Sequence, residues 1–389
     1  MQRRTFLAGA ALAGSLQAQN AVRLGVIGTG GRGRFLIEQF KEVGARVAAV
    51  CDVYEPNLQK GKAAASEGAQ TFGEYRRLLE DRSLEAVVIA TPDHWHARMA
   101  IDAVEAGKDV YLEKPMSHTI PDGFALIDAV RRTHRILQVG TQRRSSELFQ
   151  EAKAGAMQQL GDIRLVTSQW LNYQAGLSKS PLEGPLDWKQ WLGSAPQRPV
   201  DPARFWNWYY FWDYSGGLLV GQAAHVIDAI QWYMGSQQPV AVTCAGGRVN
   251  LDGAEIPETA CLAIEYPENY LATFTIGYKA MRYNPYNDQI IQFHGSKARL
   301  DLGRERYALY AASNAVEMKP EKEVNRPGSF GPATRSHIRN FLECVRSRQE
   351  PNAPVEAGQA TSMVLCMALD SLRAGKRVAW DAANRRVIG

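Results

Sequence analysis

One stretch near the N-terminus decides the fold: Val22-Arg23-Leu24-Gly25-Val26-Ile27-Gly28-Thr29-Gly30-Gly31-Arg32-Gly33. Its first part, Val22–Gly28, is an apolar run typical of a buried strand, and Arg32–Val43 has the apolar spacing of an amphipathic helix. A Gly-x-Gly-x-x-Gly turn between a strand and a helix lets the backbone approach a pyrophosphate, whose charge then lies at the helix N-terminus. We therefore predict a dinucleotide-binding turn. Its six residues are Gly28, Thr29, Gly30, Gly31, Arg32 and Gly33.

The second expected strand, Arg46–Cys51, is followed by Asp52, nineteen residues after Gly33. A carboxylate at this place accepts hydrogen bonds from the adenosine ribose hydroxyls and repels a 2′-phosphate. No Arg or Lys occurs at 53–55, although Arg32 in the turn is placed to bind such a phosphate in part. We therefore expect NAD as the cofactor in preference to NADP.

Strands and helices continue to alternate up to about Thr141, which predicts a parallel, doubly wound sheet. We expect this α/β Rossmann domain to span residues 20–142. The further strands expected are Leu84–Ala90, Asp109–Leu112 and Ile136–Val139, and the further helices are His94–Ala106 and Ile120–Thr133.

The pattern then changes to β-like segments with hairpin connections, which predicts an α+β domain over residues 143–389 with a largely antiparallel, open-faced sheet. A long segment rich in Pro, Trp and Tyr, Leu171–Ser215, interrupts these strands, and a loop of that length is usually functional or interfacial. A helix around Arg335–Val345 is expected to return towards the first domain. The expected strands are Ile163–Trp170, Val240–Ala245, Thr259–Tyr266, Tyr270–Tyr278 and Ile290–His294.

Bulk properties narrow the class of protein. A chain of 389 residues is expected to form two domains, and 45% hydrophobic and 22% charged residues are ordinary for a globular protein. The net charge of +5 is modest and the basic residues are scattered, which argues against nucleic-acid binding. The five cysteines form no Cys-x-x-Cys pair, so the chain does not resemble a disulfide scaffold.

Residues 1–19 have the layout of a signal peptide. Arg3 and Arg4 precede an Ala- and Gly-rich stretch that is too short to span a bilayer, and the order Arg-Arg-x-Phe-Leu is typical of the twin-arginine route. The alternative is an N-terminal helix of the mature fold. With the signal removed, the net charge falls from +5 to +3. We expect a periplasmic protein without a membrane span, because no later stretch is long and apolar enough.

Two further motifs carry a family resemblance: Thr91-Pro92-Asp93-His94-Trp95-His96 and Glu113-Lys114-Pro115. With the glycine turn, they resemble the Gfo/Idh/MocA family (glucose-fructose oxidoreductase, inositol dehydrogenase, rhizopine catabolism), in an exported subgroup with a twin-arginine signal. The resemblance implies a Rossmann domain followed by an open-faced sheet, and a cis or strained bond before Pro115. It also implies that residues of both motifs lie against the cofactor. These are Thr91, Pro92, Asp93, His96, Glu113 and Lys114.

Lys114 follows a strand at the edge where open α/β sheets bind ligands. A lysine there can hydrogen-bond a sugar hydroxyl and move its proton while hydride leaves the same carbon; the alternative is an ordinary surface lysine. His94 and His96 form an H-x-H pair, but they are expected to diverge at a helix start and no third ligand is evident. We therefore expect no metal.

The family resemblance implies a second catalytic element, Asp-x-x-x-His, on a helix of the second domain. Here His225 is present as a catalytic candidate, but Gly221 stands in place of the aspartate. Either Gln222 or an aspartate such as Asp213 takes over substrate binding, or the reaction differs from simple alcohol oxidation. Asp228, three residues after His225, shares its helix face and is a further substrate-binding candidate. The alternative for His225 is a buried structural histidine.

Aromatic residues are concentrated between Trp188 and Tyr214. Their faces suit the C–H face of a sugar, and tyrosine hydroxyls add hydrogen bonds, although the same residues can simply fasten a loop or fill a subunit interface. The aromatic substrate-binding candidates are Trp206, Tyr209, Tyr214 and Tyr283.

Three functions are compatible with these features. The first is an NAD-dependent dehydrogenase of a sugar or cyclitol, with Lys114 and His225 handling protons. The second is a redox-neutral glycosidase or lyase that keeps NAD bound and oxidises the sugar transiently; Gly221 and a periplasm without free NAD favour it. The third, a non-catalytic sugar-binding protein, is disfavoured by the presence of both Lys114 and His225. The resemblance also implies a homodimer or homotetramer formed through the exposed face of the second sheet.

Overall fold

The computed structural model describes residues 21–174, 176–281, 288–313 and 318–389. The expected signal segment and Tyr283 lie outside the described residues. Within these described ranges, no helix is long and apolar enough to cross a membrane.

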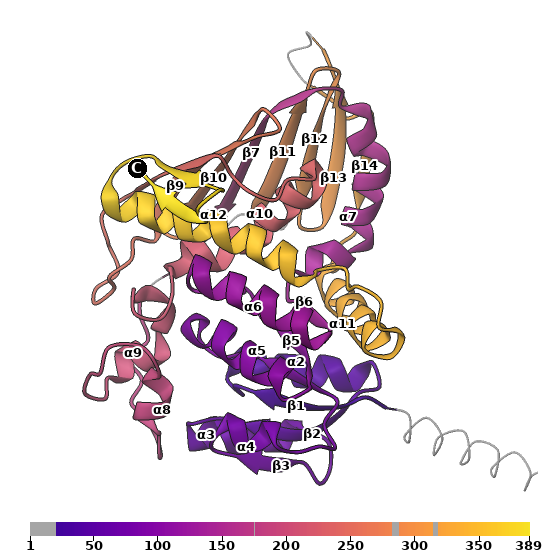
Figure 1. Cartoon of the computed structure of the whole chain (residues 1–389). Helices are drawn as coiled ribbons and strands as arrows, with labels where there is room; N and C mark the ends of the chain where they lie inside the picture. Colours follow the sequence, from indigo (N-terminus) through magenta and orange to yellow (C-terminus); the bar gives the residue numbers. More distant parts are fainter. Residues whose placement is uncertain (1–20, 175, 282–287, 314–317) are drawn as a thin grey trace, which may run out of the picture.

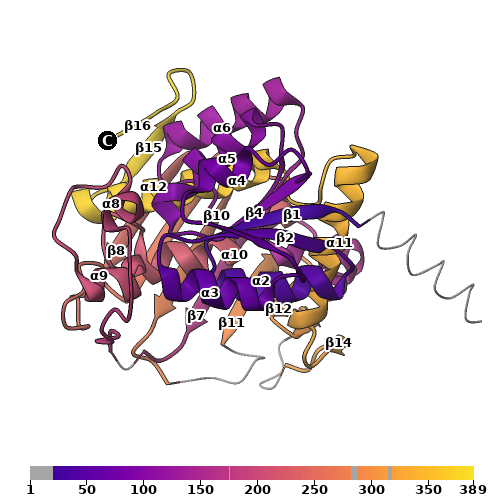
Figure 2. The same ribbon diagram turned by 90° about the horizontal axis from the view of Figure 1, so that it is seen from below.

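The first sheet has six parallel strands in the order β3-β2-β1-β4-β5-β6, which confirms the predicted Rossmann fold (Figures 1 and 2). The strands are β1 (Arg23–Ile27), β2 (Arg46–Cys51), β3 (Gln70–Phe72), β4 (Ala86–Ile89), β5 (Asp109–Leu112) and β6 (Leu137–Val139). Helices α4, α5 and α6 cover one face of this sheet, and α2 and α3 cover the other (Figure 2). Their bounds are α2 (Gly31–Glu42), α3 (Glu55–Ala64), α4 (Tyr75–Leu79), α5 (His96–Glu105) and α6 (Ile120–Thr133).

The register of the parallel strands aligns their carboxyl ends. Ile27 pairs with both Cys51 and Ile89, and Leu112 pairs with Ile89 and Val139. The residues that follow these strands therefore lie along one edge of the sheet, which is where open α/β sheets bind their ligands. All the chemistry described below begins at this edge.

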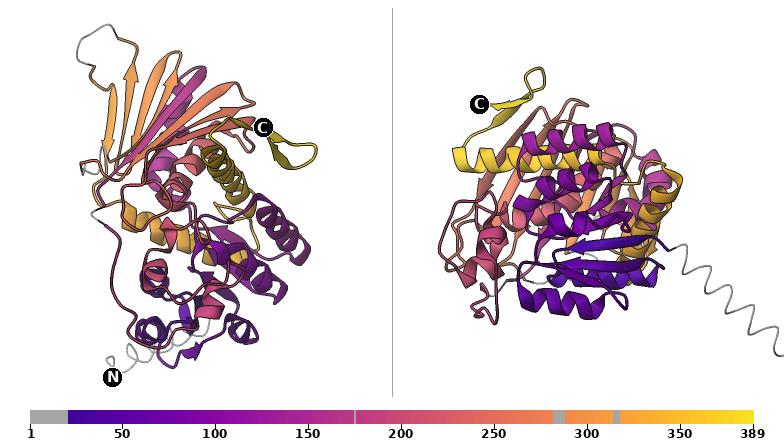
Figure 3. Two further views of the ribbon diagram at one scale, coloured as in Figure 1. Left: turned by 90° about the vertical axis from the view of Figure 1, so that its left-hand side faces the viewer. Right: turned by 60° about the horizontal axis from the view of Figure 1, so that its bottom comes forward.

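The second sheet has ten strands in the order β14-β13-β12-β11-β7-β10-β9-β8-β15-β16. β7 is parallel to β10, and the other paired neighbours are antiparallel, so the largely antiparallel sheet is confirmed. The strands are β7 (Ile163–Leu171), β8 (Ala241–Gly246), β9 (Thr259–Tyr266), β10 (Tyr270–Gly277), β11 (Gln289–Gly295), β12 (Ala298–Gly303), β13 (Arg306–Ala311), β14 (Lys322–Asn325), β15 (Val378–Asp381) and β16 (Arg386–Ile388). Helices α10 (Gly217–Met234) and α12 (Val355–Ala374) pack on one face, and the other face is open (Figure 3).

Helix α11 (Phe330–Ser347) comes after most of the second sheet in the chain but packs against the first. Its Ile338 and Phe341 are fully buried in the core of the first sheet, where Phe341 contacts the rings of Phe40 and Tyr111. The first sheet therefore obtains part of its core from the C-terminal part of the chain.

Short helices connect the two sheets and fill the segment between β7 and α10, and one more, η1 (Asp93–Trp95), joins β4 to α5. The others are η2 (Gln142–Ser145), α7 (Glu147–Glu151), η3 (Ala152–Ala156), η4 (Met157–Gln159), α8 (Trp188–Leu192), α9 (Pro202–Trp206) and η5 (Trp208–Tyr210).

Candidate active site

The glycine turn lies between β1 and α2 and is closed by tight packing. Gly28 has a φ of +85°, and a Cβ atom on Gly33 would lie 1.9 Å from the Gly28 carbonyl oxygen. Any side chain at either position would strain or displace the turn. Because the backbone is left bare here, a phosphate can approach its N–H groups.

Asp52 holds this turn in place. Its Oδ2 accepts hydrogen bonds from the backbone N–H of Thr29 (2.8 Å) and from the Thr29 hydroxyl (3.2 Å), and its Oδ1 accepts from the Tyr54 N–H (2.9 Å). Burial raises the pKa of Asp52, while these hydrogen bonds oppose the rise. The carboxylate thus joins the ends of β1 and β2 at the adenosine side of the turn.

A cavity of about 410 Å³ extends from this turn along the edge of the first sheet. Its lining includes Gly28, Asp52 and the Thr91-Pro92 turn after β4. The hydroxyl of Thr91 is buried and has no hydrogen-bond partner among the described residues. The size, the bare turn and this free hydroxyl fit a bound dinucleotide.

The far side of the cavity is formed by a segment that comes later in the chain, residues 183–215, which we call the covering segment. Tyr54 forms a bridge with Leu186, and Asp187 donates its N–H to the Val53 carbonyl (2.9 Å). The indole of Trp95 donates to the Trp191 carbonyl (2.9 Å). The covering segment lines the cavity through Gln190, Trp191, Phe205, Trp206 and Trp208.

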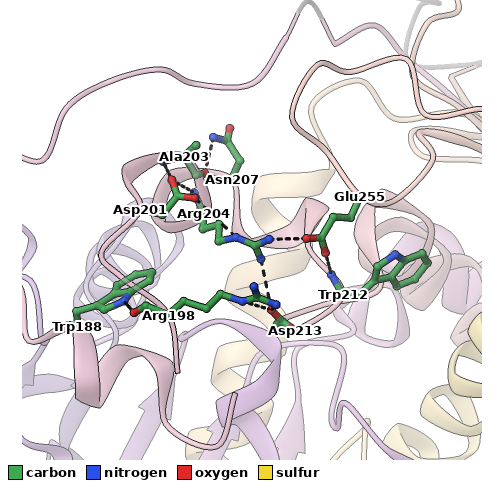
Figure 4. A network of polar contacts seen from close by, with 9 residues as sticks. All are labelled: Trp188, Arg198, Asp201, Ala203, Arg204, Asn207, Trp212, Asp213 and Glu255. Atoms are coloured by element: carbon green, nitrogen blue, oxygen red, sulfur yellow. Dashed lines mark hydrogen bonds and ion pairs between the residues drawn. The ribbon is translucent and has the colours of Figure 1, made fainter. Parts of the chain in front are cut away.

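An ion-pair network stiffens the covering segment (Figure 4). Asp213 accepts hydrogen bonds from Arg198 (2.9 Å) and Arg204 (3.4 Å), and Arg204 also pairs with Glu255. Glu255 in turn accepts the Trp212 N–H (3.1 Å). The Asp213 carboxylate is therefore committed to two arginines, so the structure does not support our hypothesis that it replaces the aspartate missing at Gly221.

Lys114 stands at the carboxyl end of β5 and reaches across to α10. Its Nζ donates a hydrogen bond to the Gly221 carbonyl oxygen (2.9 Å), and its peptide bond to Pro115 is cis. Burial lowers the pKa of the Lys114 amine, while the charges of Glu113 and Asp93 oppose the fall. The Lys114 amine therefore lies between the first sheet and α10.

Glu113, next to Lys114, is paired with Arg32 of the glycine turn. Arg32 Nε and Nη2 lie 2.7 and 2.6 Å from Glu113 Oε1. Arg32 is thus engaged by Glu113 while it also lines the cavity, and its partial binding of a 2′-phosphate stays a prediction. Three other basic residues line the cavity. We missed them in the sequence because we looked for further basic residues only at positions 53–55. They are Arg34, Lys60 and Arg76.

His225 lies one helical turn beyond Gly221 on α10 and is half-buried. The Trp170 ring of β7 lies 6.1 Å from the imidazole and 5.8 Å from the Arg143 guanidinium, measured to ring centroids. Burial and the charges of Lys114 and Arg143 lower the pKa of His225 well below its ordinary value. The ring is therefore neutral at physiological pH, as a proton acceptor must be.

Two family models match the chain. Residues 22–141 match the NAD-binding Rossmann fold of the Gfo/Idh/MocA oxidoreductase family, and residues 197–380 match the C-terminal alpha/beta domain of that family. Together these matches cover well over half of the chain. The chain belongs to the Gfo/Idh/MocA family. Its first domain is accordingly an NAD-binding Rossmann domain.

Curated relatives match over a shorter stretch. A glycosyl hydrolase family 109 protein of Solibacter usitatus is 36% identical over 132 residues, which is 31% of this chain and 30% of the relative. The alpha-N-acetylgalactosaminidase of Shewanella oneidensis is 35% identical over 123 residues, 29% of this chain and 27% of that protein. The chain thus matches less than a third of the length of these relatives.

Solved structures share the fold over nearly the whole chain. The WlbA dehydrogenase of Bordetella pertussis, solved with NADH and UDP-GlcNAcA, aligns with a TM-score of 0.71 at 22% identity and covers 93% of this chain and 99% of its own. Levoglucosan dehydrogenase, solved with NADH and L-sorbose, aligns with a TM-score of 0.73 at 17% identity and covers 92% and 98%.

In this Gfo/Idh/MocA protein, Asp93 and His96 are not among the residues that line the cavity, but they contact residues next to it. The two ring nitrogens of His96 lie 2.6 Å from the Pro115 carbonyl and 2.9 Å from the Thr91 carbonyl. Asp93 is buried and accepts a hydrogen bond from Ser215 (2.6 Å), and burial raises the pKa of Asp93. Both residues therefore position the backbone around Lys114.

His94 is turned away from His96 and towards the covering segment. Its Nε2 lies 3.2 Å from the Trp191 carbonyl oxygen, and burial lowers the pKa of His94 to about 4. Among the described residues, no group of three His, Cys, Asp or Glu side chains is arranged to hold a metal ion.

Three of the substrate-binding candidates are placed elsewhere than predicted. Asp228 is buried and accepts two hydrogen bonds from Arg144 Nε (2.9 and 3.0 Å), so it is a structural ion pair. Tyr214 is fully buried against the rings of His94 and Trp191. Trp206 lines the cofactor cavity.

Gln222 and Tyr209 stay predicted substrate-binding residues, and both lie near Tyr278, a tyrosine that was not predicted. Burial raises the pKa of Tyr278 to about 12, while hydrogen bonding from Asn172 and Gln222 opposes the rise. Tyr209 is close enough to Tyr278 for its charge to add to the rise.

The sequence reasoning also missed Arg143 and Trp170. Arg143 follows β6 just as Lys114 follows β5, so the rule that identified Lys114 would have identified it too. Trp170 is the second-last residue of β7, and nothing in its local sequence distinguishes it from a packing residue.

Proposed function

We propose that this protein oxidises a hydroxyl-bearing carbon of a sugar or sugar derivative. The observation that carries the proposal is that Lys114 of the first domain meets α10 of the second at the carbonyl of Gly221, one turn from His225. Bound NAD would supply the hydride acceptor at this edge. The residues that fit the dinucleotide are the glycine turn, Asp52 and the Thr91-Pro92 turn.

Lys114 supplies the base in this reaction. The substrate C–H bond breaks with its electron pair leaving as hydride, the O–H proton passes to the Lys114 amine, and a C=O bond forms. A neutral amine is needed for this, and burial favours the neutral form by lowering the pKa of Lys114. Oxidation of the hydroxyl releases this one proton, and His225, whose pKa is also lowered by burial, is a second group that can take it on from Lys114.

A second candidate function is redox-neutral cleavage of a glycoside, favoured by the covering segment. That segment lies over the cofactor cavity and is fastened to the first domain by hydrogen bonds at Tyr54, Val53 and Trp95. A cofactor held in this way suits a reaction that returns its hydride at the end of each cycle. The names of the glycosyl hydrolase family 109 relatives point to the same class.

This second reaction begins with the same oxidation of the sugar hydroxyl to a carbonyl. The new carbonyl acidifies the neighbouring C–H, whose proton His225 removes, and the glycosidic C–O bond breaks with its electron pair on the departing oxygen. Water then adds across the resulting double bond, and hydride returns to the carbonyl carbon. No net oxidation takes place.

One experiment separates the two functions. The protein is purified without added nucleotide, its absorbance is recorded to detect bound NAD, and it is offered aryl glycosides and free sugars. Release of the aryl group without net NADH would exclude a simple dehydrogenase, whereas stoichiometric NADH from free sugar would exclude the glycosidase. A protein inactive on both, with NAD bound, would exclude the proposed chemistry.

We further propose twin-arginine export to the periplasm and assembly into a homodimer or homotetramer. The open face of the second sheet exposes Leu165 and Leu271, which supports its use as a subunit contact. Export is tested by fractionating cells that carry Arg3→Lys together with Arg4→Lys, which should retain the protein in the cytoplasm. Assembly is tested by light scattering of the purified protein, for which a monomer would be the contrary result.

A further inference from the structure

Arg143 is a buried cation that lacks a direct anionic partner. It is 8% exposed, and its guanidinium lies 5.3 Å from the centre of the Phe149 ring and 5.8 Å from that of Trp170. A guanidinium has five N–H donors. Among the described residues, one neutral acceptor is hydrogen-bonded to it, the Gln289 Oε1 at 2.5 Å.

The carboxylates nearest to Arg143 are bound to other arginines. Asp228 receives both its hydrogen bonds from Arg144, and Asp288 pairs with Arg304 through Oδ2 at 3.0 Å, while its buried Oδ1 has no hydrogen-bond partner among the described residues. Both aspartates attract Arg143 electrostatically, and among the described residues neither forms a hydrogen bond or an ion pair with it. Three guanidinium groups thus share two carboxylates, which leaves one positive charge in excess. Burying a charge without a partner is costly, so an anion from outside the chain would stabilise this arrangement.

Arg143 stands beside the reaction centre. It follows β6, the neighbour of the strand that ends before Lys114, and the Trp170 ring that it contacts also contacts His225. A substrate whose reacting carbon lies at Lys114 and His225 can therefore extend a substituent towards Arg143.

Residue 221, beside Lys114, is a glycine and carries no charge. A Cβ atom built on Gly221 meets nothing within 4 Å, so the position opens onto free space beside Lys114. Of the carboxylates whose charges act on Lys114, Glu113 is paired with Arg32, and Asp93 is buried and accepts a hydrogen bond from Ser215. A negatively charged substrate therefore meets no free carboxylate of these residues.

We infer that the sugar on which this site acts bears a carboxylate, as in a uronic acid, and that Arg143 binds this group. The planar, two-pronged guanidinium can bind both oxygens of a carboxylate through two parallel hydrogen bonds. The absence of a side chain at Gly221 removes the repulsion that an aspartate there would exert. The inference rests on the proposed function, since it names the substrate class of the same site.

The holoenzyme is purified without added nucleotide, and its activity on each uronide is compared with its activity on the corresponding uncharged glycoside. The probes are the α- and β-anomers of p-nitrophenyl glucuronide and galacturonide, each beside the corresponding neutral glycoside and a sulfated one, together with the free sugars. Nitrophenol release and reduction of bound NAD are both followed. A uronide should exceed its neutral partner in kcat/KM by about 10- to 100-fold, the range of one charge-assisted interaction. Its KM should rise with added salt.

Three variants locate the effect. Arg143→Gln should bring the uronide-to-neutral ratio of kcat/KM close to one, and Arg143→Lys should keep part of it. Arg164→Gln removes an exposed arginine from β7 and should leave the ratio as in the wild type. Gly221→Asp has room for its side chain and should lower the ratio by repulsion, which provides a second test if Arg143→Gln does not fold.

The two proposals fail in different ways. Neutral or sulfated sugars turned over as well as uronides would overturn the inference while leaving the proposed function intact. Absence of any turnover would count against the proposed function. In that event, quenching of tryptophan fluorescence by free glucuronate and by glucose decides the inference: tighter binding of glucuronate that Arg143→Gln abolishes supports it, and equal binding contradicts it.

Discussion

The amine of Lys114 donates a hydrogen bond to the backbone carbonyl oxygen of Gly221, with 2.9 Å between the two atoms. The contact joins the turn after β5 in the first domain to α10 in the second. Because residue 221 has no side chain, the lysine meets a neutral carbonyl at this point. Burial lowers the pKa of this amine, and the carboxylates of Glu113 and Asp93 oppose the fall without an aspartate at position 221 to add to them.

Replacing Lys114 by Met should reduce turnover by about 100- to 10,000-fold, the usual contribution of a positioned general base. The NAD content of the purified protein should be unchanged, because the glycine turn and Asp52 are intact. Turnover and the absorbance of bound cofactor are measured on the same preparation. Lys41→Met, on the exposed surface of α2, is the matched control. Normal turnover of the Lys114 variant would remove its catalytic assignment.

Two glycines of α10 should respond in opposite ways to alanine. Gly221 has no positive φ and open space around its Cβ, so Gly221→Ala should raise the free energy of unfolding by about 0.4–1 kcal/mol. Gly217 has a φ of +75°, and its Cβ would lie 2.7 Å from Ile256. Gly217→Ala should therefore lower the free energy of unfolding by more than about 1 kcal/mol. Urea unfolding of both variants measures this, and equal effects would contradict the placement of these residues.

The stability should fall at mildly acidic pH because of buried histidine. His337 is fully buried, and burial lowers the pKa of its ring from 6.5 to about 4. Between these values the unfolded chain binds the proton and the folded chain does not. The free energy of unfolding should therefore fall as the pH drops from 6.5 to 4, by roughly 3 kcal/mol for this residue. His337→Gln should flatten the pH dependence, measured by urea unfolding at several pH values, whereas replacing the exposed His134 by Gln should not.

The covering segment should slow release of the cofactor. Trp206 lines the cavity and packs against Tyr54 and Phe205, so Trp206→Ala removes part of the wall. We expect NAD to dissociate about 10- to 100-fold faster, since truncating a large aromatic contact costs about 1–3 kcal/mol. Loss of NAD during dialysis is followed by absorbance, with Trp380→Ala as the control, because Trp380 stacks on Phe124 in the last hairpin region. An unchanged rate of release would show that the segment does not retain the cofactor.

The first sheet was largely predictable because its signals are local. A buried strand, a glycine turn and an amphipathic helix are each visible in a short window, and the strands β1, β2, β4, β5 and β6 were found within two residues or so of their bounds. β3 was missed because its three residues, Gln70–Phe72, lie at the sheet edge and are mostly exposed. Such a strand has no apolar run to mark it.

The substrate side was less predictable because its partners are distant in the sequence. Asp228 shares a helix with His225, yet its orientation is set by Arg144, eighty-four residues away. Tyr214 looked like a sugar-binding residue, but His94 and Trp191 bury it. Tertiary contacts of this kind decide which polar or aromatic side chains remain free to bind a substrate. A local sequence pattern does not show such contacts.

The position of α11 has a consequence for biosynthesis. The last strand of the first sheet ends at Val139. The core on one face of that sheet is nevertheless completed by Ile338 and Phe341 of α11. While the ribosome is still adding the second domain, that apolar surface stays uncovered and available to chaperones or to other chains. The nucleotide-binding half therefore matures only at the end of translation, and a chain truncated before α11 should be recognised as unfinished by the cell.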